Sequence, residues 1–161
     1  MPRRRLVLLV LAAALLLIPA APARADDAAV KRAWDAHDAQ FAKLGGDYRA
    51  ALKRWRSSGF KRAKGALGAN RKARALLARN TRGVTAASPS SADGERARRL
   101  ALASNAAFSN QLLYQARGIR LTTAGRRSAG NREFARGVTA ARRSARAAKK
   151  AKTLLRRAGV G

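Results

Sequence analysis

Apolar side chains spaced seven residues apart are the feature that most constrains the fold of this chain. Aromatic residues occupy every seventh position from 34 to 55, and other mainly apolar residues lie between them. The members of this stripe are Val30, Trp34, His37, Phe41, Leu44, Tyr48, Ala51 and Trp55. Steps of alternately four and three residues place all of them on one face of an α-helix. The pattern predicts an amphipathic helix over about residues 27–57.

The ends of this helix carry recognisable signals, and its middle carries a weak point. Asp26 and Asp27 suit the N-terminus, because their oxygens can cap free N–H groups and their charge is favoured by the helix dipole. Residues 57–59 (Ser-Ser-Gly) suit the C-terminus. Gly45 and Gly46 each cost about 1 kcal/mol relative to alanine in a helix interior. We therefore expect this helix to bend or break at the two glycines.

The aromatic stripe has two interpretations. Tryptophan and tyrosine can stack on bases or sugar rings, but stacking platforms are exposed and irregularly interleaved with basic residues. These four aromatic residues share one regular stripe with apolar neighbours. We therefore interpret them as core residues.

Three further helices are predicted over about residues 69–87, 91–124 and 131–158. The first of these is the weakest, because Gly65 and Gly68 interrupt the stretch before it and its apolar residues are mostly alanine. Ser90 followed by Asp93 forms a capping-box pattern, and Asn131 can cap the last helix. We predict an all-α fold, a small antiparallel bundle of three to four helices that forms a single domain over residues 26–161. The expected core residues are Trp34, Phe41, Tyr48, Trp55, Leu100, Phe108, Leu113, Tyr114, Leu121, Phe134 and Leu155.

The first 25 residues match a secretory signal peptide. Residues 3–5 are arginines, residues 6–18 are apolar, and residues 23–25 (Ala-Arg-Ala) form a small-x-small cleavage site. The apolar run is too short to cross a bilayer comfortably. We therefore predict export by a Sec-type signal peptide, cleavage after Ala25, and a mature protein that begins at Asp26 and is secreted or resides in the cell envelope.

Removal of the signal would leave 32 basic and eight acidic side chains, a net charge of +24. Such a charge attracts polyanions of any kind. It is also uneven, because residues 26–95 carry +8 and residues 96–161 carry +16. Drift in a GC-rich genome can enrich alanine, arginine and glycine, but it would not by itself remove acidic residues. The sequence leaves open whether the charge is functional or compositional.

The last predicted helix separates its faces most cleanly. Phe134, Ala141, Ala148 and Leu155 recur by sevens on one side, and a neighbouring row of small residues suits close helix contact. The opposite side is basic and contains no acidic residue. We predict that this side binds polyanions through Arg136, Arg142, Arg143, Arg146, Lys149, Lys150, Arg156 and Arg157.

The sequence contains no recognisable catalytic set. With no cysteine, a thiolate nucleophile and a disulfide are both excluded. No phosphate-binding loop, nucleophile elbow or dinucleotide motif occurs. His37 is the single histidine, and we interpret it as a packing residue with Asp35 or Asp38 as hydrogen-bond partners. We therefore expect no enzyme activity, no cofactor and no metal.

One six-residue sequence, Arg-Gly-Val-Thr-Ala-Ala, occurs at residues 82–87 and again at 136–141. Alignment outward from the two copies yields little further similarity. Duplication of a hairpin and chance in an Ala- and Arg-rich chain both remain open.

The combination of export and a one-sided basic helix predicts a non-enzymatic protein that binds anionic envelope polymers or anionic membrane surfaces. One alternative is a scaffold bundle with a protein partner. Another is a nucleic-acid-binding protein, if the signal is misread. Residues 135–157 resemble the tails of DNA-compacting proteins in composition only, and counterion release would favour DNA binding in vitro whatever the natural partner. The identity of the anion and the oligomeric state stay open.

Overall fold

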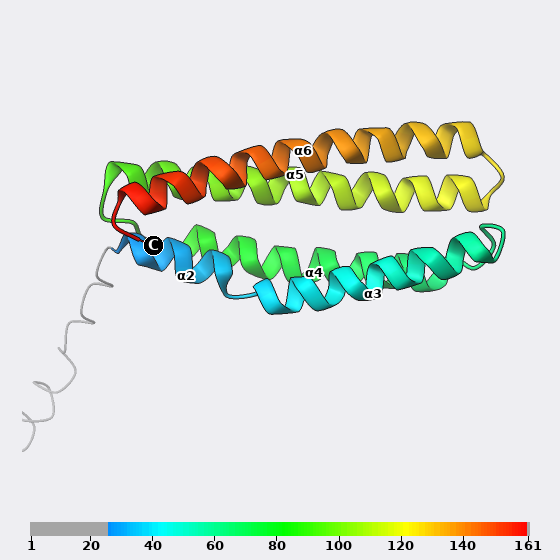
Figure 1. Cartoon of the computed structure of the whole chain (residues 1–161), viewed down its shortest axis with the longest axis horizontal. Helices are drawn as coiled ribbons and strands as arrows, with labels where there is room; N and C mark the ends of the chain where they lie inside the picture. The colour runs from blue at the N-terminus through cyan, green and yellow to red at the C-terminus, as the bar shows by residue number, and fades with distance from the viewer. Residues whose placement is uncertain (1–25, 161) are drawn as a thin grey trace, which may run out of the picture.

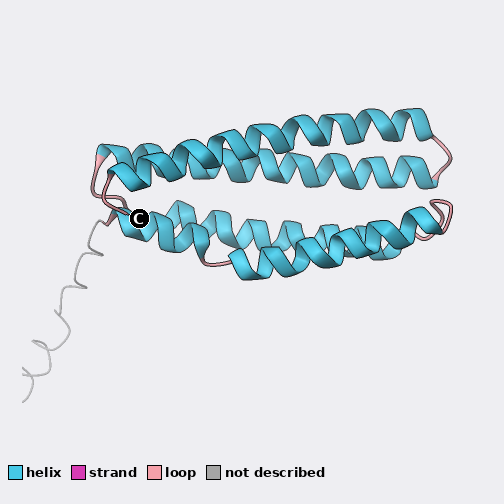
Figure 2. Cartoon of the chain, viewed as in Figure 1, coloured by secondary structure: helices cyan, strands magenta, loops and turns pink. Residues whose placement is uncertain are grey.

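The computed structural model describes residues 26–160, so the predicted signal peptide lies outside the described part. Residues 26–160 form helices and turns with no β-strand, and the predicted all-α class is confirmed. Figure 2 shows this helical content, and Figure 1 shows two layers, with α2 and α3 beside α4 in one and α5 beside α6 in the other. The helices are α2 (Asp27–Asp35), α3 (Asp38–Ser57), α4 (Lys64–Ala86), α5 (Ala92–Thr123) and α6 (Arg127–Arg157).

The helix expected over residues 27–57 is two helices, and the break lies at Ala36 and His37. The prediction of a break at Gly45 and Gly46 is therefore wrong, because both residues lie inside the uninterrupted helix α3. At the break, Asn80 of α4 donates hydrogen bonds from Nδ2 to the carbonyls of Ala33 and Trp34, at 3.2 and 2.8 Å. A buried side chain of α4 thus binds the last turn of α2.

The α5–α6 contact is the most extensive of the fold, and small residues make it close. Gly118, Gly130 and Gly137 are buried between the two helices. The serine hydroxyls of Ser104 and Ser144 each donate to the other's backbone carbonyl, at 3.1 and 3.0 Å. The expected row of small residues on the last helix is confirmed here.

Close packing of small residues also explains why the predicted core is only partly right. Of the eleven expected core residues, Trp55 and Leu155 are buried and the other nine are half-buried. Alanines supply much of the buried surface instead, and the apolar residues form three separate clusters along the molecule.

The two chain ends of the described part lie at the same end of the molecule (Figure 1). The backbone N–H of Asp26 donates to the Ser88 carbonyl at 2.8 Å. Val160 packs on a cluster that contains Val30 and Leu155. Both ends are therefore attached to the folded helices.

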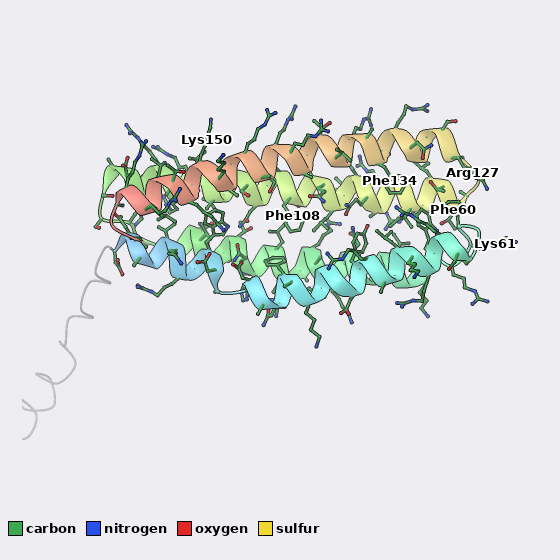
Figure 3. The ribbon with its side chains drawn as sticks, in the orientation of Figure 1. Phe60, Lys61, Phe108, Arg127, Phe134 and Lys150 are labelled. Carbon is green, nitrogen blue, oxygen red and sulfur yellow. The ribbon has the colours of Figure 1, made fainter. Side chains whose placement is uncertain are left out.

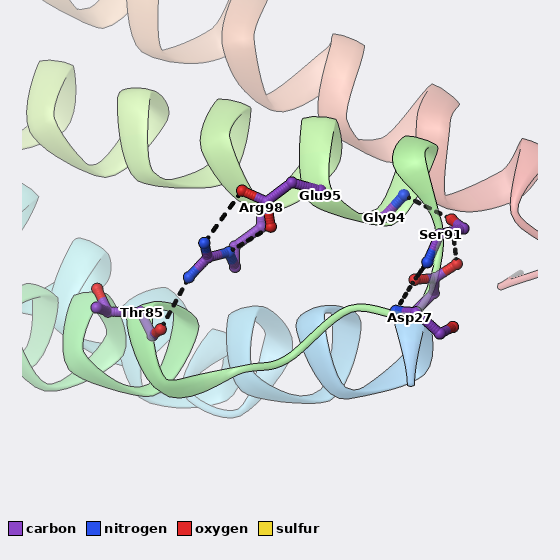
Figure 4. A network of polar contacts seen from close by, with 7 residues as sticks. Asp27, Thr85, Ser91, Gly94, Glu95 and Arg98 are labelled. Carbon is purple, nitrogen blue, oxygen red and sulfur yellow. Dashed lines mark hydrogen bonds and ion pairs between the residues drawn. The ribbon is translucent and has the colours of Figure 1, made fainter. Parts of the chain in front are cut away.

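The start of α2 is joined to the start of α5 through one buried carboxylate (Figure 4). Asp27 Oδ1 accepts hydrogen bonds from the backbone N–H groups of Ser90 and Ser91, at 2.8 and 3.0 Å, and Oδ2 accepts from the Ser91 hydroxyl. The bond from the Ser91 hydroxyl is the main reason that the pKa of Asp27 lies below its usual value. A Cβ at Gly94 would overlap Asp27 Oδ1, so this position requires glycine.

Two predicted helix caps differ from those observed. Ser91, not Ser90, is the N-cap of α5, and its hydroxyl accepts from the Gly94 N–H at 2.9 Å. Helix α6 begins at Arg127, so Asn131 lies within the helix instead of capping it. The segment between these helices is a tight turn in which Gly125 has a φ of 78°.

The two copies of the six-residue repeat occupy different environments. Val84, in the first copy, is fully buried at the end of α4, whereas Val138, in the second, is 52% exposed in the middle of α6. Equivalent residues of the repeat therefore have different structural roles.

Candidate polyanion-binding face

The basic residues of α6 lie away from the helix that it packs against. The side of α6 that faces the bundle buries Gly130, Glu133, Gly137, Ala140, Ala151 and Leu155. All eight predicted site residues are exposed. Figure 3 shows side chains, Lys150 among them, projecting from the outer side of this helix. We call the set Arg136, Arg142, Arg143, Arg146, Lys149, Lys150, Arg156 and Arg157 the α6 basic face.

Carboxylates neutralise almost none of this face. Arg136 pairs with Glu133 at 2.6 Å between Nη1 and Oε1. Within residues 26–160, the other seven members form no ion pair. Glu133 is only 8% exposed and belongs to the buried side of α6, so it leaves the outer surface uninterrupted. Like charges three and four residues apart repel by a few tenths of a kcal/mol per pair. An anion that covered the face would relieve this repulsion.

The C-terminal part of the α6 basic face borders an apolar hollow of about 650 Å³. Lys149 and Arg156 line it together with Trp34 of α2, and Lys152 Nζ lies 5.9 Å from the centroid of the Trp34 ring. Trp34 is half-buried and packs on the cluster that contains Val30. Trp34 therefore packs on this cluster and has the Lys152 ammonium over its ring.

Sequence reasoning missed a second basic cluster, at the turn between α3 and α4. Arg54, Lys61, Arg62 and Lys64 surround an open hollow of about 840 Å³. Figure 3 places Lys61 and Arg127 at the same end of the molecule. The signal was present in the sequence, because residues 53–64 contain six basic side chains and no acidic one.

His37 lies at the junction between α2 and α3. It is half-buried at the N-cap position of α3, where its side chain does not cap the helix. Its Nδ1 atom is buried without a hydrogen-bond partner, so the expected bond from this nitrogen to Asp35 or Asp38 is not formed. Across the described residues, no three His, Asp or Glu side chains group in a way that could hold a metal ion.

The other aromatic residues of the stripe pack inside the molecule. Phe41 contacts Phe108 of α5 with ring centroids 6.0 Å apart, and Trp55 contacts Phe134 of α6 at 6.2 Å. The indole N–H of Trp55 lies within hydrogen-bonding distance, 3.0 Å, of both the Phe60 carbonyl and the Thr123 hydroxyl. These contacts agree with the interpretation of the stripe as a packing surface.

Comparison with models of protein families, with curated proteins and with solved structures finds nothing similar to this chain. In the part of the chain that the structure describes, no helix combines the length and the apolar character needed to cross a bilayer. Function therefore has to be inferred from the arrangement of the side chains themselves.

Proposed function

We propose that this protein is exported, has no enzymatic activity, and binds anionic polymers of the cell envelope or anionic membrane surfaces through the α6 basic face. The observation that supports this most directly is the exposure of eight basic side chains on one side of one helix, seven of them without an ion-pair partner in residues 26–160. The proposal needs no cofactor and no metal.

A long helix suits a polymeric or planar partner. Residues of α6 rise by about 1.5 Å each, so the basic side chains from Arg136 to Arg157 extend over roughly 30 Å. Arginine forks and lysine ammonium groups spaced along this length can contact many phosphates or carboxylates at once. Each contact releases counterions, so affinity should fall steeply as salt rises.

The rigidity of the supporting layer also favours this function. We propose that the mature chain is a small antiparallel bundle in which α5 serves as the base for α6. The contacts that support this pair Thr122 with Gly130, Gln111 with Gly137, and Ser104 with Ser144, so positions earlier in α5 meet positions later in α6. A helix held along its length presents its charges in a fixed row.

The test compares two variants with the same loss of charge. One replaces five members of the face, Arg142, Arg143, Arg146, Lys149 and Lys150, with glutamine. The matched control replaces five exposed basic residues of α4 with glutamine, namely Arg71, Lys72, Arg74, Arg79 and Arg82. Binding to anionic wall polymer, to phosphatidylglycerol vesicles and to duplex DNA is measured across a salt series.

We expect the face variant to lose at least tenfold in affinity for envelope polymer or vesicles and to show a shallower salt slope. The affinity and the salt slope of the α4 variant should differ far less from those of the wild type. Equal losses in both variants would mean that diffuse charge, not the α6 face, binds the anion. DNA as the preferred partner at physiological salt, or a single protein recovered stoichiometrically at high salt, would favour the alternative functions.

A separate experiment tests export. Protein recovered from the medium or the envelope should begin at Asp26 when its N-terminus is sequenced. A chain that stays in the cytoplasm with residues 1–25 attached would contradict both the signal peptide and the envelope partner.

A further inference from the structure

We propose that the hollow between α3 and the α5–α6 pair is a binding site for a small aromatic anion. It lies at the end of the molecule where Phe60, Arg127 and Phe134 gather (Figure 3) and has a volume of about 710 Å³. Pockets for small molecules commonly range from about 300 to 1,000 Å³. A polymer or a membrane would not enter a hollow of this size, so the site differs from the α6 basic face, with which it shares only Arg142.

The walls of this hollow are aromatic. Tyr48 and Trp55 come from α3, Phe60 from the following turn, and Phe134 from α6. The Trp55 and Phe60 rings meet edge to face at 5.0 Å, and Trp55 also contacts Phe134. Trp55 is 2% exposed, so the half-buried rings of Tyr48, Phe60 and Phe134 supply the aromatic surface that a flat ligand can contact. These walls favour a ligand with a planar ring.

An apolar side chain is also left open to solvent here. Val138 lines the same hollow and is 52% exposed, the one large hydrophobic side chain of residues 26–160 that reaches such exposure. Of the lining residues beside it on α6, Gly137 is buried, Ala141 is half-buried and Arg142 is exposed. A ligand in the hollow would cover this apolar surface.

Three buried polar atoms on the lining residues have no hydrogen-bond partner. They are the Tyr48 hydroxyl, Gln115 Oε1 and Thr122 Oγ1, and each belongs to a residue that lines the hollow. These atoms are enclosed by their neighbours, and Thr122 Oγ1 faces Gly130 in the α5–α6 contact, so a ligand in the hollow would reach them only if the wall residues moved. The aromatic and cationic side chains that line the hollow therefore define the site.

The charges around the hollow select an anion. Arg56, Arg127 and Arg142 line it, and none of its lining residues is acidic. The Arg127 guanidinium already lies over the Phe60 ring, 5.6 Å from the ring centroid, so one cationic group is held beside the aromatic wall. Guanidinium groups bind carboxylates, sulfonates and phosphates through paired hydrogen bonds. The ligand class that fits is an aromatic ring system with one such group.

The probe is 8-anilinonaphthalene-1-sulfonate, an aromatic sulfonate whose fluorescence increases in apolar sites. Its uncharged analogue is N-phenyl-1-naphthylamine. Both are titrated into the purified protein, and into a Trp34→Phe variant in which Trp55 is the single remaining tryptophan. We expect one sulfonate per chain, strong quenching of Trp55 by energy transfer, and affinity for the uncharged analogue roughly tenfold lower.

Two kinds of variant locate the site. Ala141 lines the hollow and Ala135 is an exposed alanine on the same helix. Ala141→Phe should weaken both probes at least tenfold, whereas Ala135→Phe should leave both unchanged. A double Arg56→Gln, Arg127→Gln variant should weaken the sulfonate roughly tenfold and leave the uncharged analogue unaffected.

Several results would overturn the proposal. They are binding of many sulfonates per chain, no quenching of Trp55, or equal probe affinity in the Ala141→Phe and Ala135→Phe variants. Circular dichroism shows whether each variant keeps its helix content. If Ala141→Phe fails to fold, the double Arg56→Gln, Arg127→Gln variant still tests the site, because both arginines lie on the surface. Neither Arg56 nor Arg127 belongs to the α6 basic face, so failure here leaves polyanion binding intact, and the reverse also holds.

Discussion

Asn80 shows how one side chain can fix the path of a distant segment. Its Nδ2 group donates to the carbonyls of Ala33 and Trp34, while its Oδ1 accepts from Asn105 Nδ2 at 2.9 Å. Asn80 is 2% exposed, so none of these groups has access to bulk water. The three hydrogen bonds join α2, α4 and α5 at one buried point.

We predict that Asn80→Ala lowers the free energy of unfolding by about 1–3 kcal/mol, because buried polar groups lose their partners. Urea unfolding monitored by circular dichroism measures this change. Asn110, an exposed asparagine of α5, gives the control Asn110→Ala, which should cost less than about 0.5 kcal/mol. Equal costs for the two variants would mean that the buried hydrogen bonds contribute nothing to stability.

Asp27 predicts a pH dependence of stability. Its pKa in the folded protein is lowered, chiefly by the hydrogen bond from the Ser91 hydroxyl, while the unfolded chain has a value near 3.8. The stabilisation from Asp27 is therefore fully present above the unfolded pKa and is lost as the pH falls through the folded pKa. Only the ionised form of the Asp27 carboxylate provides this stabilisation.

We expect Asp27→Asn to be less stable than the wild type at pH 7 by about 1–3 kcal/mol. The gap should narrow as the pH falls from the unfolded value near 3.8 towards the lower folded pKa, because protonation of the carboxylate then favours the unfolded chain. Thermal unfolding from pH 7 to pH 3 measures both proteins, with the exposed Asp47→Asn as control. A gap that stays constant over this range would contradict the assigned role of the carboxylate.

At the scale of helices, glycines have opposite roles according to what surrounds them. A Cβ at Gly130 would overlap Thr122 Oγ1 and lie 3.0 Å from the Gly118 carbonyl oxygen. A Cβ at Gly68, inside α4, would meet no atom within 4 Å. The first glycine permits helix contact, whereas the second only adds backbone freedom to the unfolded chain.

We therefore predict that Gly130→Ala lowers the free energy of unfolding by about 1–3 kcal/mol through overpacking. Gly68→Ala should raise it by up to about 1 kcal/mol. Chemical denaturation of both variants measures the two effects. If both substitutions changed the free energy of unfolding in the same direction, the contacts around each glycine would not explain its effect on stability.

The spacing of side chains predicts helices well here and predicts their junctions poorly. Steps of three and four residues identify the helical segments, because they depend only on neighbours along the chain. Just before the break at Ala36, the carbonyls of Ala33 and Trp34 accept from Asn80, more than 40 residues away in the sequence, and no local pattern reveals this contact. Similarly, the half-burial of Phe108 involves a contact with Phe41, a residue of another helix.

The two candidate sites also differ in how far the sequence predicts them. Exposure of Arg143 or Lys150 follows from helix periodicity once Leu155 is placed inside, so a sequence can predict the α6 basic face. The aromatic hollow joins Tyr48, Gln115 and Phe134 from three helices. Only the packing of those helices brings the three side chains together, and no spacing in the sequence encodes that contact.

Across the whole molecule, repulsion among basic groups opposes folding. The chain carries a formal charge of +28, and the exported form that we propose would carry +24. Screening shortens the range of this repulsion, from about 30 Å at 0.01 M salt to about 8 Å at 0.15 M. Stability should therefore depend on ionic strength more than it does for proteins of balanced charge.

We predict that the melting temperature rises by several degrees between 10 and 150 mM sodium chloride. The five-residue glutamine variant of the α6 basic face should melt higher than the wild type at low salt and respond less to added salt. Differential scanning calorimetry across the salt series measures both. A melting temperature that falls with salt would mean that attractive ion pairs outweigh repulsion in this fold.

The shared location of Asp26 and Val160 has a practical consequence for orientation. Asp26 donates to Ser88, and Val160 packs against the cluster beneath it, so both attachment points lie at one end of the molecule (Figure 1). A protein that begins at Asp26, as we propose, and is tethered to a bead or a sensor chip through either end would have the turns at residues 58–63 and 124–126 farthest from the support. The aromatic hollow near those turns would then face the solution in every immobilised copy.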